Sequence, residues 1–229
     1  MDEARNTVAL IPGYQEGPRI AAVVAGARLF LPVVVVDDGS TDDTEEQAEA
    51  AGATVLVQRA NAGKGAALRA GFRHALGNGA TAVVTLDADG QHDPAEIPSF
   101  LTAFEATGAE LIIGRRDFGT MPLVRRLSNT LGGRVFSVAV GRRVPDNQSG
   151  FRLIGRTLMA ALLDSTESGF EFEVEMIARC IALGLPIASV PIRTIYAGEP
   201  SHIRPWRHFT EFLRVTRKAR RIAHGGEGD

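Results

Sequence analysis

Residues 83–94, VVTLDADGQHDP, join a short apolar strand to a cluster of polar side chains and then to the start of a helix. Residues 83–86 are apolar or β-branched, as in a strand buried inside a sheet. Carboxylate, amide and imidazole groups then fill one turn around Gly90. Pro94 favours the first position of a helix. The stretch therefore predicts a strand–turn–helix unit whose polar turn lies at the carboxyl end of a buried strand.

The same alternation continues in both directions along the first half of the chain. Strands are predicted at residues 7–11, 33–36, 54–58, 82–86 and 110–114. Helices are predicted between them at residues 18–30, from an N-cap at Thr41 to Gly52, at residues 63–76 and from Pro94. Apolar strands separated by helices indicate a mainly parallel sheet with helices on both faces. The predicted fold class is therefore α/β, Rossmann-like and doubly wound.

The second half of the chain is less regular. It contains a predicted helix at 123–140, an edge strand at FRLI (151–154), a helix ending at Leu183 and a strand at 187–192. No internal repeat or low-complexity linker divides it. We therefore expect a single domain over residues 1–205, followed by a basic helix and a short polar tail over residues 206–229.

The bulk composition fits an ordinary globular protein with one sizeable core, since the chain has 229 residues, 45% of them hydrophobic. The formal net charge of −2 argues against nucleic acid as a partner. A single cysteine, Cys180, excludes an internal disulfide and is expected in the core. No apolar run approaches the roughly 20 residues that cross a bilayer, and the N-terminus does not resemble a secretory signal. We expect a cytoplasmic protein, able to associate with the inner face of the membrane.

Polar clusters follow each of the first five predicted strands. They are residues 12–17 (PGYQEG), 37–43 (DDGSTDD), 59–65 (RANAGKG), 87–93 (DADGQHD) and 115–117 (RRD). Any one of them could be a solvated turn. Ligands of a doubly wound sheet bind outside the carboxyl ends of its strands, so five clusters at the same edge predict a binding site.

The cluster at residues 87–93 contains the oxygen groups of a divalent-cation site. Asp87, Asp89 and Gln91 alternate, so in an extended segment their side chains point to one side. Two carboxylates and an amide oxygen suit Mg²⁺ or Mn²⁺, and a zinc site is disfavoured because only His92 offers nitrogen. The simpler alternative is a turn followed by an aspartate that caps the next helix.

Two further clusters suit a nucleotide. Asp37 or Asp38 can accept a hydrogen bond from a base or a ribose hydroxyl, unless one of them caps the following helix. The glycines around Lys64 let backbone N–H groups approach an anion at a helix start, and the lysine adds positive charge. The stretch matches neither the P-loop pattern nor GxGxxG, so we expect a metal-dependent nucleotide site of another kind.

Seven stretches together resemble the family 2 glycosyltransferases, and most of all the dolichyl- and polyprenyl-phosphate mannosyl- and glucosyltransferases. They are IPGYQE, VVVVDDGSTDDT, NAGKGAALRAGF, LDADGQHDP, IIGRR, NQSGFRLI and GFEFEVEMI, in the family's order. The resemblance implies a GT-A fold, a donor of the GDP-mannose or UDP-glucose type, a Mg²⁺ or Mn²⁺ ion and a polyprenyl or dolichyl phosphate acceptor. It also implies inversion at the anomeric centre.

The resemblance carries over to individual residues. A cation is implied at Asp87 and Asp89, with Gln91 as a further ligand. The base and ribose pocket is implied at Pro12, Tyr14, Glu16 and Asp37, to which the residue patterns above add Asp38 and Lys64. The implied catalytic residues are Asp89, Arg116, which suits phosphate, and Glu175, the recurring acid of a helix. The acceptor loop is implied at Ser149 and Arg152.

One departure from the family concerns the acceptor. Pro200 separates Glu199 from Ser201, and His202 stands where lysine is expected, although Arg204 can compensate. We count His202 and Arg204 among the candidate acceptor-binding residues. Because of this departure, a glycosyltransferase that acts on a soluble hydroxyl acceptor remains an alternative. The alternative from another functional class is a non-catalytic module that binds a sugar nucleotide or a lipid.

The acceptor decides whether a general base is needed. A lipid phosphate is already an anionic nucleophile, whereas a hydroxyl needs a carboxylate within reach. The candidates for that base are Asp146, Glu173 and Glu175. The alternative for the two glutamates is a favourable position near a helix N-terminus.

The C-terminal stretch WRHFTEFLRVTRKARRIAH (206–224) has an amphipathic helical pattern. Apolar residues recur at helical spacing, and arginines and one lysine occupy the other faces. Such a helix either lies on an anionic membrane or docks its apolar stripe on its own domain. Both alternatives stay open from the sequence.

Overall fold

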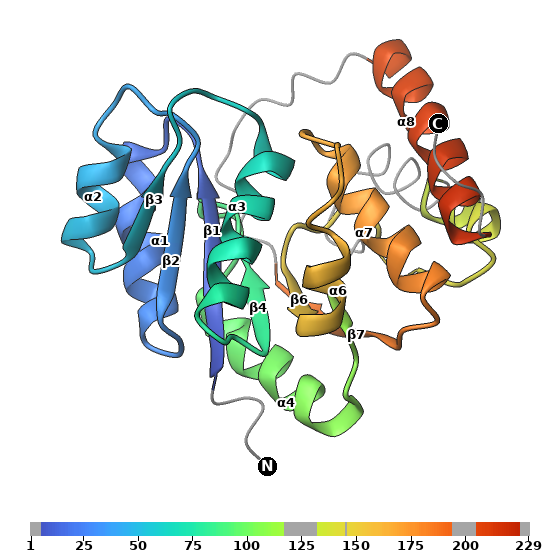
Figure 1. Cartoon of the computed structure of the whole chain (residues 1–229), viewed down its shortest axis with the longest axis horizontal. Coiled ribbons are helices and arrows are strands. Elements are labelled where there is room, and N and C mark those ends of the chain that lie inside the picture. Colours follow the sequence, from blue (N-terminus) through green and yellow to red (C-terminus); the bar gives the residue numbers. More distant parts are fainter. Residues whose placement is uncertain (1–5, 117–131, 145, 194–204, 225–229) are drawn as a thin grey trace.

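In the computed structural model the chain forms a seven-stranded sheet with helices on both faces (Figure 1). The structure describes residues 6–116, 132–144, 146–193 and 205–224, with the side chains of the last helix described from Arg214 onward. The strands are β1 (Thr7–Gly13), β2 (Val33–Asp37), β3 (Thr54–Val57), β4 (Ala82–Thr85), β5 (Leu111–Arg116), β6 (Arg152–Gly155) and β7 (Ile187–Ile192). The helices are α1 (Gly17–Arg28), α2 (Thr44–Ala50), α3 (Lys64–Gly77), the 3₁₀ turn η2 (Pro94–Glu96), α4 (Ile97–Thr107), α6 (Arg156–Ala161), α7 (Glu171–Ala182) and α8 (Pro205–Ala223).

Among the strands that the structure describes, the order is β3-β2-β1-β4-β6-β5-β7, and only β6 runs antiparallel to its neighbours. The predicted doubly wound, mainly parallel α/β sheet is therefore confirmed. The prediction of an edge strand at residues 151–154 is wrong, because β6 lies between β4 and β5 and is buried throughout. Since Thr85 pairs with Arg152, the start of β6 lies at the carboxyl end of β4.

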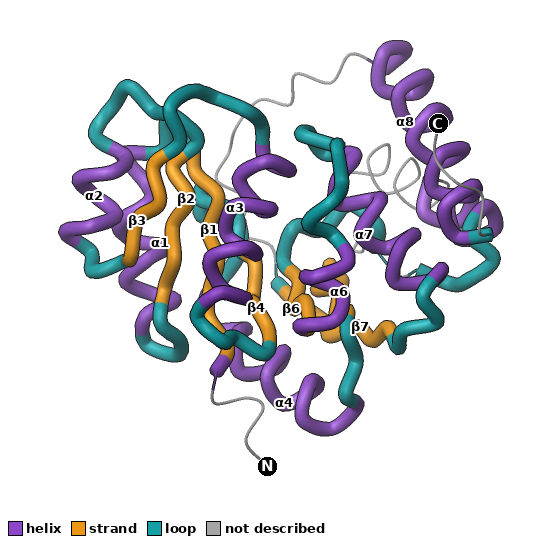
Figure 2. Tube along the Cα trace, in the orientation of Figure 1, coloured by secondary structure: helices purple, strands orange, loops and turns teal. Residues whose placement is uncertain are grey.

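Each face of the sheet has its own hydrophobic core. On one face Leu10 and Val34 pack with residues of α3, α6 and α7, such as Phe72 and Phe172. On the other face the alternate strand residues, such as Ile11, pack with α1, α2 and α4. Figure 2 shows loops lying over the carboxyl ends of β1, β2 and β3. Both faces of the sheet are thus covered by apolar packing. Polar side chains can instead gather in the loops at the carboxyl ends of the strands.

The start of α2 differs from the prediction. The helix begins at Thr44, not after an N-cap at Thr41. The Thr41 hydroxyl instead accepts a hydrogen bond from the Gln15 side chain at 2.8 Å. Asp42 accepts hydrogen bonds from the hydroxyl and the backbone N–H of Thr44, at 2.5 and 3.2 Å, and the hydroxyl bond lowers the pKa of this carboxyl. The turn is therefore held by its own residues and by Gln15, which precedes α1 and lies far from the turn in the sequence.

The turn after β4 leads into the helix predicted from Pro94. Pro94 begins η2, and α4 follows directly. The Asp93 carboxylate accepts the backbone N–H of Ala95 at 3.0 Å. Asp93 is thus the helix-capping aspartate of the simpler alternative. Asp87 and Asp89 are not used as caps of this helix.

Helix α8 packs against α7. Thr216 and Ala219 are buried in that contact, and Ile222 packs against the same core. The predicted helix at residues 123–140 is seen as a helix at 132–139, and the rest of its N-terminal part lies outside the described residues. Within the described part of the chain, no helix is long and apolar enough to cross a membrane.

Candidate functional site

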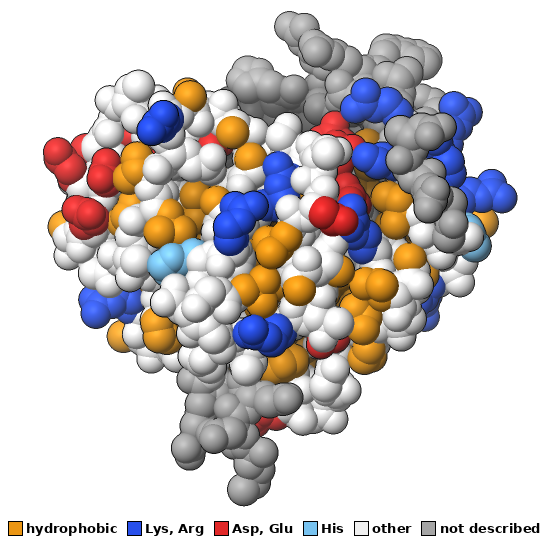
Figure 3. Space-filling view, in the orientation of Figure 1, with side chains coloured by type: hydrophobic (Ala, Val, Ile, Leu, Met, Phe, Trp, Pro, Cys, Tyr) orange, Lys and Arg blue, Asp and Glu red, His pale blue; other side chains and the backbone are white. Residues whose placement is uncertain are grey.

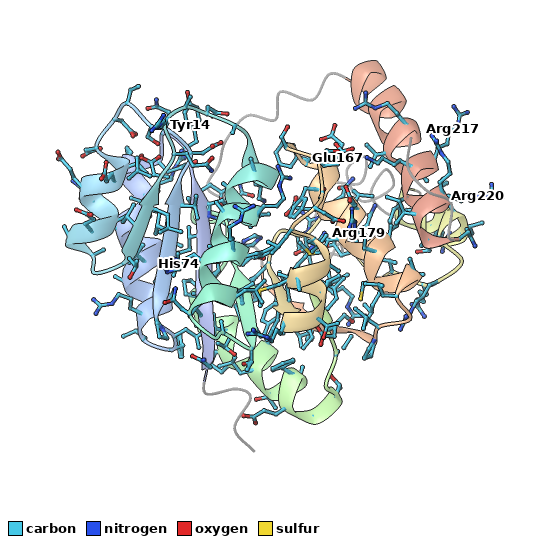
Figure 4. The ribbon with its side chains drawn as sticks, viewed as in Figure 1. Tyr14, His74, Glu167, Arg179, Arg217 and Arg220 are labelled. Atoms are coloured by element: carbon cyan, nitrogen blue, oxygen red, sulfur yellow. The ribbon has the colours of Figure 1, made fainter. Side chains whose placement is uncertain are left out.

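A cleft of about 480 Å³ opens at the carboxyl ends of β1, β2 and β4. Seven of the residues predicted from the sequence line it, namely Pro12, Tyr14, Glu16, Asp38, Lys64, Asp87 and Asp89. They come from four separate loops, and parallel strands bring these loops to one edge. Figure 4 shows Tyr14 at this edge, beside the strand ends. Four of the five polar clusters expected at one edge therefore meet in this cleft, whereas Arg115 and Arg116 of the fifth do not line it.

The loop after β1 is fixed by the loop after β2. The backbone N–H of Gln15 donates to the Ser40 hydroxyl at 2.9 Å, and that of Glu16 donates to the Thr44 hydroxyl at 2.8 Å. Gln15 adopts a φ of 58°, which is uncommon for a residue other than glycine. These contacts hold Tyr14 at the mouth of the cleft with 46% of its surface exposed. An exposed aromatic ring at this position can stack on a flat ligand group.

The two aspartates after β2 have different positions. Asp37 is buried, does not line the cleft, and accepts hydrogen bonds from the Ser40 N–H and hydroxyl at 3.0 and 2.5 Å. Asp38 lines the cleft and accepts the backbone N–H groups of Ala62 and Gly63 at 2.9 and 2.7 Å. The structure therefore brings Asp38, but not Asp37, to the predicted nucleotide site.

The glycine-rich start of α3 is closed by protein groups. The backbone N–H of Gly65 donates to the Ser168 carbonyl at 2.7 Å, while that of Gly63 binds Asp38. A Cβ on Gly65 would lie 2.7 Å from the Phe172 Cβ. The glycines thus allow the 165–170 loop to pack closely on the helix. The expectation that their N–H groups face an anion is not met at these two positions.

Lys64 joins two carboxylates at the centre of the cleft. Its ammonium lies 2.5 Å from Asp87 Oδ1 and 3.1 Å from Glu173 Oε1. Burial opposes the charge on Lys64, but the two carboxylates outweigh it and raise the pKa of the ammonium. Burial likewise opposes ionisation of Asp87, and the Lys64 charge outweighs it, so the pKa of Asp87 is lowered. Lys64 and Asp87 are therefore both charged at neutral pH.

His92 supports Asp87 as a neutral ring. Its Nδ1 accepts the backbone N–H of Asp87 at 3.1 Å, and burial lowers the pKa of the imidazole. The Nδ1–carboxylate separation of 3.9 Å is therefore not an ion pair. His92 also packs on Phe151, with ring centroids 5.1 Å apart. The histidine fixes the turn instead of supplying a metal ligand.

Asp87 and Asp89 carry oxygen groups of the kind that a hard divalent cation prefers. Both line the cleft, whereas Gln91 does not and is seen to donate its backbone N–H to Asp89 Oδ1 at 2.9 Å. Among the described residues, no group of three or more His, Cys, Asp or Glu side chains is arranged to hold a metal ion. Mg²⁺ is commonly bound by one or two carboxylates together with substrate phosphates and water. Two carboxylates in an open cleft fit that mode.

The other predicted catalytic residues lie outside the cleft lining. Arg116, at the end of β5, donates to both oxygens of Asp146 at 2.8 and 2.9 Å. Glu175 is buried and accepts hydrogen bonds from Ser165 at 2.9 Å and Arg179 at 2.7 Å. It lines a second hollow, of about 360 Å³, between α7 and α8. The position of Glu175 does not support the predicted catalytic role.

In the predicted acceptor loop, Gly150 lies close to the side chains of Asp87 and Lys64 in the cleft. Thr85 donates its hydroxyl hydrogen to the Gly150 carbonyl at 2.8 Å. Ser149 is buried, and its hydroxyl has no hydrogen-bond partner among the described atoms. Arg152 is also buried and donates to backbone carbonyls, those of Ser149 at 2.7 Å, Glu173 at 2.5 Å and Asn147 at 3.1 Å. Arg152 therefore holds the backbone of this loop in place through hydrogen bonds from its buried guanidinium. His202 and Arg204 lie outside the described residues.

Sequence reasoning missed Phe170 as a cleft residue. Its ring is 75% exposed, lines the cleft and lies 5.8 Å from the Lys64 ammonium. The sequence signal is weak, since one aromatic residue directly before a helix is compatible with a hydrophobic contact. Its exposure depends on how the 165–170 loop packs on α3.

Comparison with known proteins gives consistent results. Residues 8–162 match the model of glycosyl transferase family 2. The chain is 35% identical over 198 residues to the undecaprenyl-phosphate mannosyltransferase of Micrococcus luteus, covering 80% of this chain and 81% of that protein. It is 31% identical over 204 residues to the polyprenol monophosphomannose synthase of Mycolicibacterium smegmatis, covering 82% and 77%.

A solved structure supports the fold. Glucosyl-3-phosphoglycerate synthase from Mycobacterium tuberculosis, in complex with Mn²⁺, UDP-glucose and phosphoglyceric acid, matches with a TM-score of 0.72 and 23% identity. The match covers 97% of this chain and 81% of that one. The predicted GT-A fold is confirmed.

Proposed function

Because this chain belongs to glycosyl transferase family 2 and is a glycosyltransferase, we propose that it transfers a hexose from a nucleotide-diphosphate sugar to a polyprenyl phosphate. Two relatives are named for acceptors of this class, an undecaprenyl phosphate and a polyprenol monophosphate product. The transfer inverts the anomeric centre, since a single displacement by the phosphate oxygen is sufficient.

The cleft supports the donor half of this proposal. Pro12, Tyr14 and Asp38 line the cleft, and they would form the base and ribose side of the donor pocket. Asp87 and Asp89 would hold Mg²⁺ or Mn²⁺. The ion, when bound, neutralises charge on the departing diphosphate. Lys64, at the start of α3, adds a further positive charge to the diphosphate side of the cleft.

The ion pairs made by the three candidate bases support the second half of the proposal, a phosphate acceptor. Asp146 is bound by Arg116, Glu173 by Lys64, and Glu175 by Arg179, at 2.8, 3.1 and 2.7 Å. None of these three carboxylates lines the cleft and each already bonds a cation, so none is placed to take a proton from a hydroxyl acceptor. A phosphate oxygen needs no proton removed. It attacks the anomeric carbon directly, and the bond to the nucleotide diphosphate breaks with its electron pair on the leaving oxygen.

Helix α8 supports contact with an anionic membrane surface. In its described part the apolar side faces α7, and the exposed side contains Arg214, Arg217, Arg220 and Arg221. Figure 3 shows Lys and Arg side chains gathered around α8, while Asp and Glu gather around α2 on the opposite side. We propose that this arginine face attracts anionic headgroups while the apolar stripe stays docked on the domain.

Thermal unfolding tests the donor site. The melting temperature is measured with GDP, UDP and dTDP, each with Mn²⁺ and with EDTA. One nucleotide is expected to raise it by about 5–10 °C at saturation, in the presence of metal only. The absence of any metal-dependent shift would refute the donor site.

The acceptor is tested with the nucleotide sugar so identified. Polyprenyl phosphate is compared with the polyprenol of the same chain length, which lacks only the phosphate. Transfer to the phosphate alone is expected. Equal transfer to the polyprenol hydroxyl would instead require a base and would refute the proposed acceptor.

A further inference from the structure

The Lys64 ammonium contacts the carboxylate of Asp87, which is an expected metal ligand. It therefore lies close to the position that a bound metal ion would take. It is 2.5 Å from Asp87 Oδ1 and 3.1 Å from Glu173 Oε1, and 20% of the lysine side chain is exposed. Without Lys64, the buried Glu173 and the partly buried Asp87 would share this part of the cleft with only the Arg152 guanidinium acting on both carboxylates. The lysine thus stabilises the cleft in the absence of ligands.

The surroundings of Asp87 leave little room for two cations. A Cβ on Gly150 would lie 2.8 and 2.9 Å from the two Asp87 oxygens and 3.0 Å from Lys64 Nζ, so the backbone closes that side. The backbone N–H of Asp87 is bound by His92 behind the turn. A divalent cation on Asp87 would therefore lie close to the ammonium. At such distances the repulsion between the two charges is large.

We propose that Lys64 is an internal counter-ion which the divalent cation displaces from Asp87, and which then binds the diphosphate of the donor. This inference rests on the proposed function, since it assumes a cation and a nucleotide diphosphate in the cleft. A lysine suits the role, because its charge is carried at the end of a flexible four-carbon chain. Lys64 also begins α3, at the same end of the cleft as Asp87.

The displacement makes metal and nucleotide binding cooperative. A cation that enters alone must break the Lys64–Asp87 pair and leaves the ammonium without its partner. A diphosphate that enters with the cation supplies a new partner for the ammonium. Each ligand should therefore raise the affinity for the other by the same factor, and Lys64 should carry much of that coupling.

Mn²⁺ titration of the full chain tests the coupling, with and without the nucleotide diphosphate that stabilises the protein. Without nucleotide, Lys64→Met is expected to bind Mn²⁺ about 10-fold more tightly than wild type, because Asp87 is released. The increase in Mn²⁺ affinity caused by nucleotide should be smaller in the variant by about the same factor. Lys218→Met is the matched control, since Lys218 is the only other lysine and lies on α8, outside the cleft. Unchanged or weaker Mn²⁺ binding by folded Lys64→Met would overturn the inference.

A second measurement uses the wild-type chain, in case Lys64→Met does not fold. Amine acylation followed by mass spectrometry reports Lys64 and Lys218 separately. Saturating Mn²⁺ is expected to raise the acylation rate of Lys64 several-fold, and added nucleotide diphosphate to lower it again, while Lys218 stays constant. If Mn²⁺ binds and the Lys64 rate does not change, the inference fails and the donor site stands. If neither Mn²⁺ nor nucleotide binds, the proposed function fails as well.

Discussion

At the scale of one residue, Gly150 keeps the space in which Asp87 and Lys64 meet. Alanine is tolerated by the backbone there, but its Cβ would lie within 3.0 Å of both side chains. We expect Gly150→Ala to weaken metal-dependent nucleotide binding about 10-fold or more and to destabilise the fold by about 1–3 kcal/mol. Nucleotide titration and thermal unfolding measure the two effects. Gly77→Ala, whose Cβ meets nothing within 4 Å, is the control. Wild-type nucleotide affinity in Gly150→Ala would contradict this assignment.

At the scale of an element, α8 has a docked face and an exposed basic face. Figure 4 shows Arg217 and Arg220 pointing away from the domain. Replacing both by glutamate should weaken binding to phosphatidylglycerol vesicles about 30-fold or more, because each lost arginine removes about 1 kcal/mol of attraction. Vesicle co-sedimentation measures it, with Arg59→Glu/Arg73→Glu, two exposed arginines elsewhere, as the matched control. Equal loss in both double variants would indicate a net-charge effect and not a membrane-binding face.

At the scale of the whole molecule, Cys180 reports global unfolding. It lies on the buried face of α7, and burial raises the pKa of its thiol from 9.0 to about 12. We expect no alkylation of the folded chain at pH 8 and one label per chain in denaturant, followed by mass spectrometry. The unfolded thiol ionises first, so this group's contribution to stability is present below pH 9 and is lost as the pH rises towards 12. Rapid labelling in native buffer would disprove the expected protection.

The sequence by itself determined the alternation of strands and helices and the edge at which the chemistry lies. The first five strands were all predicted to within two residues at each end, because buried strands need continuous apolar runs. The largest differences are at the ends of β1 and β5, which each extend two residues further than expected, through Gly13 and Arg116. The polar clusters were also readable, since each directly follows a strand. Seven predicted residues consequently line one cleft.

Only the tertiary structure decided which polar side chains face that cleft. Glu173 and Glu175 are two positions apart on α7, about 200° around the helix, so they point to opposite sides. Glu175 pairs within its own helix with Arg179, whereas the docking of α7 on α3 turns Glu173 to Lys64. The position of β6 is likewise set by pairing between strands that are far apart in the chain. Such contacts depend on residues distant in sequence, and local patterns of polarity contain no information about them.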